Sequence, residues 1–128
     1  MSEPEWLNSQ IVCAIQAEQL AIYGGATGVR DAGLLASALD RPRNQWAYGE
    51  TDLHALAAAY AFGIAKNHPF VDGNKRTSLL AIYTFFAMNG LELDAEEAQA
   101  AVHIQALAAG ELTEAQLTGW LKTVTIAG

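Results

Sequence analysis

The sequence predicts an all-α fold of about six helices, and three observations support this prediction. Apolar residues recur at helical spacing along most of the chain, glycine and proline separate the helical segments, and alternating strand patterns are almost absent. The 128 residues are 52% hydrophobic and only 16% charged, which suits an ordered chain with a real core. A chain of this length is expected to form one domain, spanning residues 1–128.

Capping residues and helix breakers delimit the first two helices. Residues Asn8 to Tyr23 are predicted to form a helix that ends at Gly24, because glycine readily takes the left-handed conformation that closes a helix. Asp31 suits the N-cap of a second helix, which is expected to end at Pro42. The fold has room for a small β-hairpin, and residues 45–52 are where we expect it.

The next two helices flank one polar segment. TDLHALAAAYAFGIAKN is apolar on nearly every face, as expected of a central helix covered by the others, and it ends before His68 and Pro69. NKRTSLLAIYTFFAMNG starts after the turn VDG and stops at Asn89 and Gly90. Two further helices, separated at Gly110, are predicted from their capping boxes, Asp94-x-x-Glu97 and Thr113-x-x-Gln116.

The charge distribution argues for one local anion site on an acidic body. The formal net charge is -7, which disfavours sequence-independent binding to nucleic acid, because that needs many contacts from Lys and Arg to phosphates. Six of the seven Lys and Arg residues nevertheless lie between positions 30 and 76. Arg41 and Arg43 belong to this group, and the sequence leaves open whether they bind target or nucleotide or are solvated loop charges.

Nothing in the sequence has the pattern of a targeting or membrane-spanning segment. The longest apolar runs, 55–65 and 79–88, are well short of the roughly 18 residues that span a bilayer, and residues 1–10 lack the regions of a signal peptide. The single cysteine, Cys13, has no disulfide partner and suits a buried position. We therefore expect a cytoplasmic protein that binds neither membranes nor nucleic acid directly.

The segment HPFVDGNKR, residues 68–76, places two cations where a helix begins. Lys75 and Arg76 oppose the helix dipole, whose positive end already lies there. A bound phosphate would reverse this cost, since both cations and the N–H groups around Gly73 and Asn74 would then face an anion. The placement therefore predicts a phosphate site.

His68 and Asp72 supply the remaining groups for phosphoryl or nucleotidyl transfer. Pro69 keeps His68 out of helical geometry, and a histidine can transfer protons near neutral pH. A carboxylate beside a phosphate site commonly holds Mg²⁺ together with phosphate oxygens and water, a role that suits Asp72. Two structural interpretations stay open at this point, namely Asp72 as a turn residue or helix N-cap and Asn74 as a capping residue.

HPFVDGNKR resembles the Fic motif, whose general form is His-Pro-Phe-x-[Asp/Glu]-Gly-Asn-[Gly/Lys]-Arg. The surrounding chain is similar to the death-on-curing (Doc) branch of that superfamily in YGG at 23–25, RD at 30–31, LLASAL at 34–39 and AAAYAFGIAKN before the motif. The resemblance implies an all-helical Fic fold and a bacterial toxin of a type II toxin-antitoxin system. No glutamate of this chain precedes Gly or Asn, as in the inhibitory segment of autoinhibited Fic proteins, so restraint is expected from a partner antitoxin.

The resemblance also implies a role for each motif residue. His68 would take the proton from a target hydroxyl, and Asp72 would hold Mg²⁺. The residues that would contact the phosphates of ATP are Gly73, Asn74, Lys75 and Arg76.

Lys75 separates two reactions within the superfamily. AMP-transferring Fic enzymes carry glycine at this position, whereas Doc-type proteins carry lysine and are associated with transfer of the γ-phosphate of ATP to a threonine of elongation factor Tu. The resemblance thus favours a Mg²⁺- and ATP-dependent protein kinase that arrests translation. AMP transfer stays an alternative, because Gly73 stands where the Doc motif has alanine. An alternative of another class is a non-catalytic module that binds an antitoxin and modulates its DNA binding.

Overall fold

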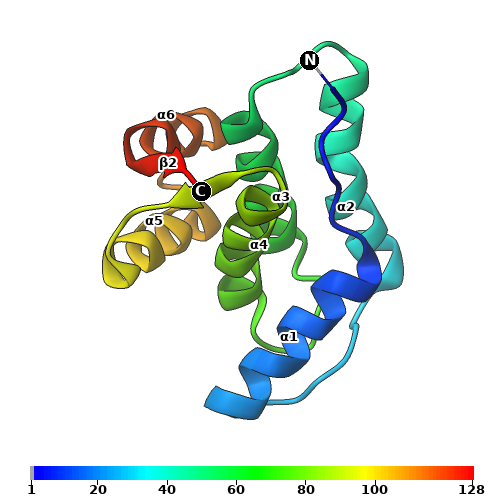
Figure 1. Ribbon diagram of the computed structural model, residues 1–128. Helices are drawn as coiled ribbons and strands as arrows, with labels where there is room; N and C mark the ends of the chain where they lie inside the picture. Colours follow the sequence, from blue (N-terminus) through cyan, green and yellow to red (C-terminus); the bar gives the residue numbers. More distant parts are fainter. Residues whose placement is uncertain (1) are drawn as a thin grey trace.

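The computed structural model describes residues 2–128, which form six helices and two short strands (Figure 1). In chain order these are α1 (Ser9–Tyr23), α2 (Ala32–Ala47), α3 (Leu53–Asn67), α4 (Asn74–Met88), β1 (Leu91–Leu93), α5 (Glu97–Ala109), α6 (Glu114–Val124) and β2 (Thr125–Ala127). The predicted all-α class is confirmed, and α1, α3 and α4 have the predicted ends to within about two residues. None of the helices in residues 2–128 combines the length and the hydropathy needed to pass through a bilayer.

α3 and α4 lie side by side at the centre of the molecule. In Figure 1, α1 and α2 lie on one side of this pair, and α5 and α6 lie on the other. All residues of α3 from Leu56 to Ala61 are fully buried, as its almost wholly apolar sequence predicted. The loop that joins α3 to α4 is therefore held between the two most deeply packed helices, and this loop and the first turn of α4 carry the segment HPFVDGNKR.

α2 comes very close to α3 where Ala38 meets Gly63. A Cβ atom at Gly63 would lie 2.9 Å from the Cα of Ala38 and 3.3 Å from its carbonyl oxygen, so only glycine allows the two helices this approach. The same carbonyl would normally accept a helical hydrogen bond from residue 42, but Pro42 has no N–H to donate. The contact between α2 and α3 thus lies where the carbonyl of Ala38 has no helical hydrogen-bond donor.

The prediction that the second helix ends at Pro42 was wrong, because α2 continues to Ala47. A proline inside a helix costs on the order of 3 kcal/mol. Burial offsets this cost, since Pro42 is itself buried and Trp46, one turn later, packs against the core. Trp46 also meets Trp6 edge to face, with ring centroids 6.3 Å apart. Tertiary packing, not local propensity, sets the end of α2.

The two-stranded pair does not lie in residues 45–52, where we expected a hairpin. β1 instead pairs antiparallel with β2 from beyond α6, with Glu92 opposite Ile126. Residues 45–52 complete α2 and turn at Gly49. Each strand has only three residues, which is too short for an alternating pattern to appear in the sequence.

The helix caps agree with the sequence at α6 and differ at α5. Thr113 and Gln116 form the predicted capping box. The predicted start at Asp94 was wrong, because α5 takes Glu96 as its N-cap. The reason is strand pairing, since the N–H of Asp94 donates to the carbonyl of Val124 (2.6 Å) and holds this residue beside β2.

Gly63→Ala is expected to destabilise the fold by about 1–3 kcal/mol, because the new methyl group would meet the backbone of Ala38. Urea denaturation followed by circular dichroism measures the change. Gly119→Ala in α6 is a matched control, since nothing lies within 4 Å of its Cβ position and alanine is the better helix former. Equal stability of the two variants would contradict the close approach of α2 to α3.

Asp52 links the start of α3 to α6. Its Oδ1 accepts from the N–H of His54 (2.9 Å) and lies 2.7 Å from Nδ1 of His54, and its Oδ2 lies 3.0 Å from Nζ of Lys122. Burial raises the pKa of Asp52, but the hydrogen bonds from Lys122 and His54 outweigh burial and leave this pKa below its ordinary value. A carboxyl with a lowered pKa stabilises the folded state above its unfolded pKa, and the contribution is lost as pH falls through the folded pKa.

Asp52→Asn is therefore expected to lower the free energy of unfolding near pH 7, and by progressively less as pH falls through the folded pKa of Asp52, where the wild-type carboxyl also becomes protonated. Asparagine preserves the N-cap of α3, so the comparison isolates the charge. Urea titrations across this pH range make the measurement. A loss of the same size at every pH would show that the charge contributes nothing.

Candidate active site

His68 occupies the turn at the end of α3 with a left-handed backbone. Its φ is 48° and its ψ is 56°, and it is the only non-glycine residue within 2–128 with a positive φ. Its N–H still donates to the carbonyl of Ile64 (3.2 Å), so the residue caps the helix as a glycine usually would. The imidazole is exposed at the helix end, as the sequence predicted from the proline that follows.

The loop between α3 and α4 is paired with the segment that joins α1 to α2. The carbonyl of Pro69 accepts from the N–H groups of Arg30 (2.7 Å) and Asp31 (3.1 Å), and the N–H of Val71 donates to the carbonyl of Gly28 (3.0 Å). Residues 28–31, which we call the clamp segment, thus hold the loop from a distant part of the sequence. No helix-spacing pattern could have revealed this pairing.

Phe70 and Asn74 fix the loop from within. Phe70 is buried, and its N–H and carbonyl both bond to the side-chain amide of Asn74, at 3.0 Å each. Asn74 is only 8% exposed, and these two bonds use its Oδ1 and Nδ2. The side chain of Asn74 therefore holds the loop together, and its backbone N–H is the group that stays available for the predicted phosphate contact.

Asp72 is exposed, and its carboxylate is oriented from the segment between α1 and α2. Its Oδ2 accepts from the N–H of Ala26 (2.9 Å), and its carbonyl accepts from Nε2 of Gln16 (3.1 Å). Asp72 is not the N-cap of α4, because Gly73 takes that place with a φ of 74° and offers no side-chain cap. The structural interpretation of Asp72 as a helix cap was therefore wrong.

Gln16 is a buried polar residue that the sequence analysis missed. It is 2% exposed on the inner face of α1 and bonds to the backbone of both neighbouring loops. The sequence contains part of the information needed to predict its burial, since Gln16 stands at helical spacing between the buried Val12 and Leu20. A glutamine on a buried helix face is expected to form hydrogen bonds, but the sequence does not identify their partners.

The start of α4 offers unpaired N–H groups and two exposed cations. Within residues 2–128, none of the hydrogen bonds uses the N–H groups of residues 74–76, the first turn contains no acidic residue, and Lys75 and Arg76 are exposed. The guanidinium of Arg76 lies 3.8 Å from the ring centroid of Tyr23, the last residue of α1. This helix end has the features of an anion site.

A cleft of about 380 Å³ brings every predicted site residue together. Its lining consists of His68, Val71, Asp72, Gly73, Asn74, Lys75 and Arg76. Among residues 2–128 there is no cluster of three or more potential metal ligands. Asp72 nevertheless fits a Mg²⁺ site in which phosphates and water supply the other ligands, because it is exposed and no hydrogen bond within the described range uses its Oδ1.

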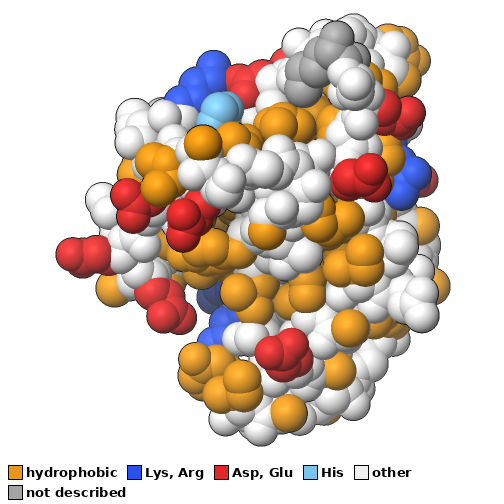
Figure 2. Space-filling view, viewed as in Figure 1, with side chains coloured by type: hydrophobic (Ala, Val, Ile, Leu, Met, Phe, Trp, Pro, Cys, Tyr) orange, Lys and Arg blue, Asp and Glu red, His pale blue; other side chains and the backbone are white. Residues whose placement is uncertain are grey.

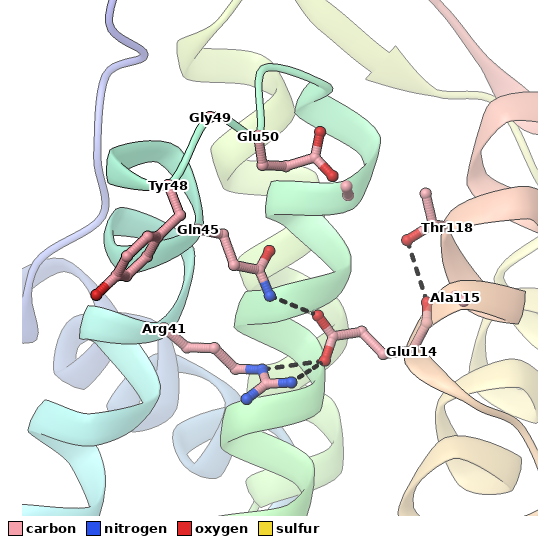
Figure 3. A pocket seen from close by; sticks show the side chains of 9 residues that line it. Arg41, Gln45, Tyr48, Gly49, Glu50, Glu114, Ala115 and Thr118 are labelled. Atoms are coloured by element: carbon pink, nitrogen blue, oxygen red, sulfur yellow. Dashed lines mark hydrogen bonds and ion pairs between the residues drawn. The ribbon is translucent and has the colours of Figure 1, made fainter.

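A larger cavity of about 720 Å³ lies between α2, the start of α3 and α6 (Figure 3). Arg41 and Glu114 form an ion pair in this cavity, and both oxygens of Glu114 accept hydrogen bonds, from Arg41 and from Nε2 of Gln45 (2.9 Å). Arg43 donates to the carbonyl of Leu7 (3.2 Å). Both arginines therefore make structural contacts, and neither lines the cleft of His68.

Six of the fourteen acidic residues lie after position 90. Figure 2 shows several of them on the side where α5 lies, in the last third of the chain. The two cations of the cleft thus stand on a body whose formal net charge is -7.

Comparison with known proteins agrees with this geometry. A sequence model of the Fic/DOC family matches residues 6–86, which include α1 to α3 and the whole cleft. The chain belongs to the Fic/DOC family. It is 44% identical over 77 residues to the toxin Doc of Mycolicibacterium smegmatis, and the match covers 58% of each chain. It is 32% identical over 88 residues to the protein kinase doc of Escherichia phage P1, which covers 68% of this chain and 70% of that protein.

The Fic/DOC match covers about the first two thirds of the chain. Residues 6–86 stop within α4, so α5, α6 and the strand pair lie beyond the matched part. The match spans 58% of the length of the Mycolicibacterium relative, which is less than two thirds, and 70% of the length of the phage relative. What each of these proteins does is therefore a basis for a proposal about this chain.

Asn74→Ala is expected to destabilise the fold by about 1–3 kcal/mol, because it leaves the buried N–H and carbonyl of Phe70 without partners. Lys75→Ala, at the next position, removes an exposed side chain and is expected to change stability by less than about 0.5 kcal/mol. Thermal or urea unfolding of both variants makes the comparison. Similar losses in both would contradict the structural assignment of Asn74.

Proposed function

We propose that this chain is a toxin of the Fic/Doc type that transfers the γ-phosphate of ATP to a protein hydroxyl. The observation that carries the proposal is the cleft, where His68 and Asp72 face the uncapped start of α4 with Lys75 and Arg76. Lysine at position 75 supports phosphate transfer over AMP transfer, and one relative bears the name protein kinase doc.

The reaction assigns one task to each group. The target hydroxyl would lose its proton to the imidazole of His68 as its oxygen attacks the γ-phosphorus, and the bond to the bridging oxygen of ADP would break. The N–H groups at the start of α4, with Lys75 and Arg76, would hold the phosphates. Mg²⁺ held by Asp72 would supply charge neutralisation on the phosphates. Gly73 takes the left-handed conformation from which α4 begins.

We propose partners and a setting in keeping with the toxin Doc relative. The protein substrate would be a translation factor, elongation factor Tu in the first instance, and its phosphorylation would arrest translation and growth. A cognate antitoxin would restrain the toxin as part of a type II toxin-antitoxin system. The protein would act in the cytoplasm and would bind neither nucleic acid nor membranes directly.

Two other functions use the same surface. AMP transfer would need ATP bound in the opposite direction in the same cleft, and Gly73 in place of the Doc alanine is the residue that favours it. A non-catalytic module that binds an antitoxin and modulates its DNA binding would need the cleft only as a structural remnant. The transfer assay below separates all three.

Incubation with ATP labelled at the γ- or the α-phosphate, together with Mg²⁺ and a bacterial lysate, tests the proposal directly. We expect label from the γ-position on a single major protein and none from the α-position. Label from the α-position alone would establish AMP transfer instead, and no label from either would favour the binding module.

His68→Ala is expected to lower transfer by about 10²-fold or more, because it removes the proton acceptor while leaving the phosphate contacts. The same substitution should abolish growth arrest when the protein is expressed without an antitoxin. An exposed site makes a large effect on folding unexpected, and thermal unfolding checks this point. Full activity of the variant would rule out His68 as the base.

A further inference from the structure

We infer that Arg30 is a positioning residue for His68 and acts through the backbone of the loop between α3 and α4. The inference rests on the proposed function, because it assumes that His68 carries out the transfer chemistry. Arg30 lies in the clamp segment, far from His68 in the sequence, and it does not line the cleft.

The need for such a residue follows from the conformation of His68. A left-handed backbone is rare for residues other than glycine, and it persists only where the surroundings fix it. The imidazole cannot do this itself, since it is exposed and none of the hydrogen bonds within residues 2–128 involves its ring nitrogens. The conformation of His68 must therefore be fixed through the backbone of this residue and of its two neighbours in the chain.

The side chain of Arg30 binds the two carbonyls at this point. Its Nε donates to the carbonyl of His68 (2.8 Å), and its Nη2 donates to the carbonyl of Asn67 (3.0 Å). These are carbonyls that the end of α3 leaves without helical partners. The planar guanidinium can serve both at once, and its positive charge suits the negative end of the helix dipole.

The backbone N–H of Arg30 binds the carbonyl of the residue after His68, Pro69. This N–H donates to the carbonyl of Pro69 at 2.7 Å, so one residue binds the carbonyls of three successive residues, from the last residue of α3 into the loop. The side chain of Asn67 adds a bond to the carbonyl of Leu34 in α2 (3.0 Å), which ties the same turn to the next helix. Rotation of the peptide after His68 would break the bond to Nε of Arg30.

Burial cannot replace these bonds, because residues 21–30 are all exposed. The clamp segment therefore depends on its hydrogen bonds to stay in place, and the fork of Arg30 provides two of them. Loss of this side chain should release the left-handed turn without removing any group from the cleft.

Arg30→Ala tests the inference with two readouts. We expect kcat for γ-phosphate transfer to fall by about 10- to 100-fold, as a displaced catalytic group would cause, while KM for ATP changes by less than about twofold. Backbone chemical shifts of His68 in the labelled protein should lose the left-handed signature. Arg30→Lys keeps the charge but not the planar fork, so it should lie between the wild type and Arg30→Ala, and it replaces that variant if alanine prevents folding.

Arg43→Ala is the matched control, since Arg43 also donates to a backbone carbonyl, that of Leu7, but away from the cleft. It should leave kcat within about twofold of the wild type and His68 left-handed. The inference is overturned if His68 stays left-handed in folded Arg30→Ala, or if it leaves that conformation while kcat is unchanged. If the wild-type protein transfers no label at all, the proposed function fails, and the chemical shifts alone decide whether Arg30 sets the turn.

Discussion

Between Asn67 and Asn74 the chain must leave one buried helix and enter the next, and the left-handed turn at His68 makes this possible. The turn places the imidazole at a helix end, which is exposed, instead of on a helix face that the core would cover. Its cost is met by hydrogen bonds from the clamp segment, in particular from Arg30. The position of the candidate base thus depends on residues that precede α2 in the chain.

The start of α4 lacks the usual sources of helix stability. Gly73 offers no side-chain cap, the first turn has no acidic residue, and Lys75 and Arg76 oppose the dipole. Asp72 stands beside this helix end and could have capped it, but it bonds to Ala26 instead. A helix end that lacks all these features is costly when empty and well suited to an anion, which is a reason to regard it as a binding site and not as a packing element.

The parts of the molecule that sequence reasoning found are those governed by local rules. Helix ends at Gly24 and Asn89 and the exit from α3 before Pro69 follow from backbone preferences of single residues. What it missed depends on contacts between distant residues. The length of α2 is set by Trp46 on the core, and the strand pair joins segments on either side of α5 and α6.

The candidate site shows the same division. The six residues predicted for it all line one cleft, because five neighbouring positions and one helix end are close in space whatever the rest of the fold does. The sequence could not assign the side chain of Asn74 to Phe70, nor connect Gln16 and Arg30 to the loop. Hydrogen bonds between separate segments leave no periodic signal in a single sequence.

The motif itself alternates between residues that face the cleft and residues that fix the loop. His68, Asp72 and Lys75 are exposed, whereas Phe70 and Asn74 are buried and bonded to each other. The motif therefore contributes to the conformation of the loop as well as to its chemistry, but only through hydrogen bonds between its own residues. The remaining constraint comes from outside the motif, where Gln16 binds the carbonyl of Asp72 and Arg30 binds that of His68.

A chain could keep every residue from His68 to Arg76 and still place the base wrongly if the residues that hold the loop were lost. The chemistry proposed for the motif would therefore depend on two segments together, the loop between α3 and α4 and the clamp segment that is paired with it.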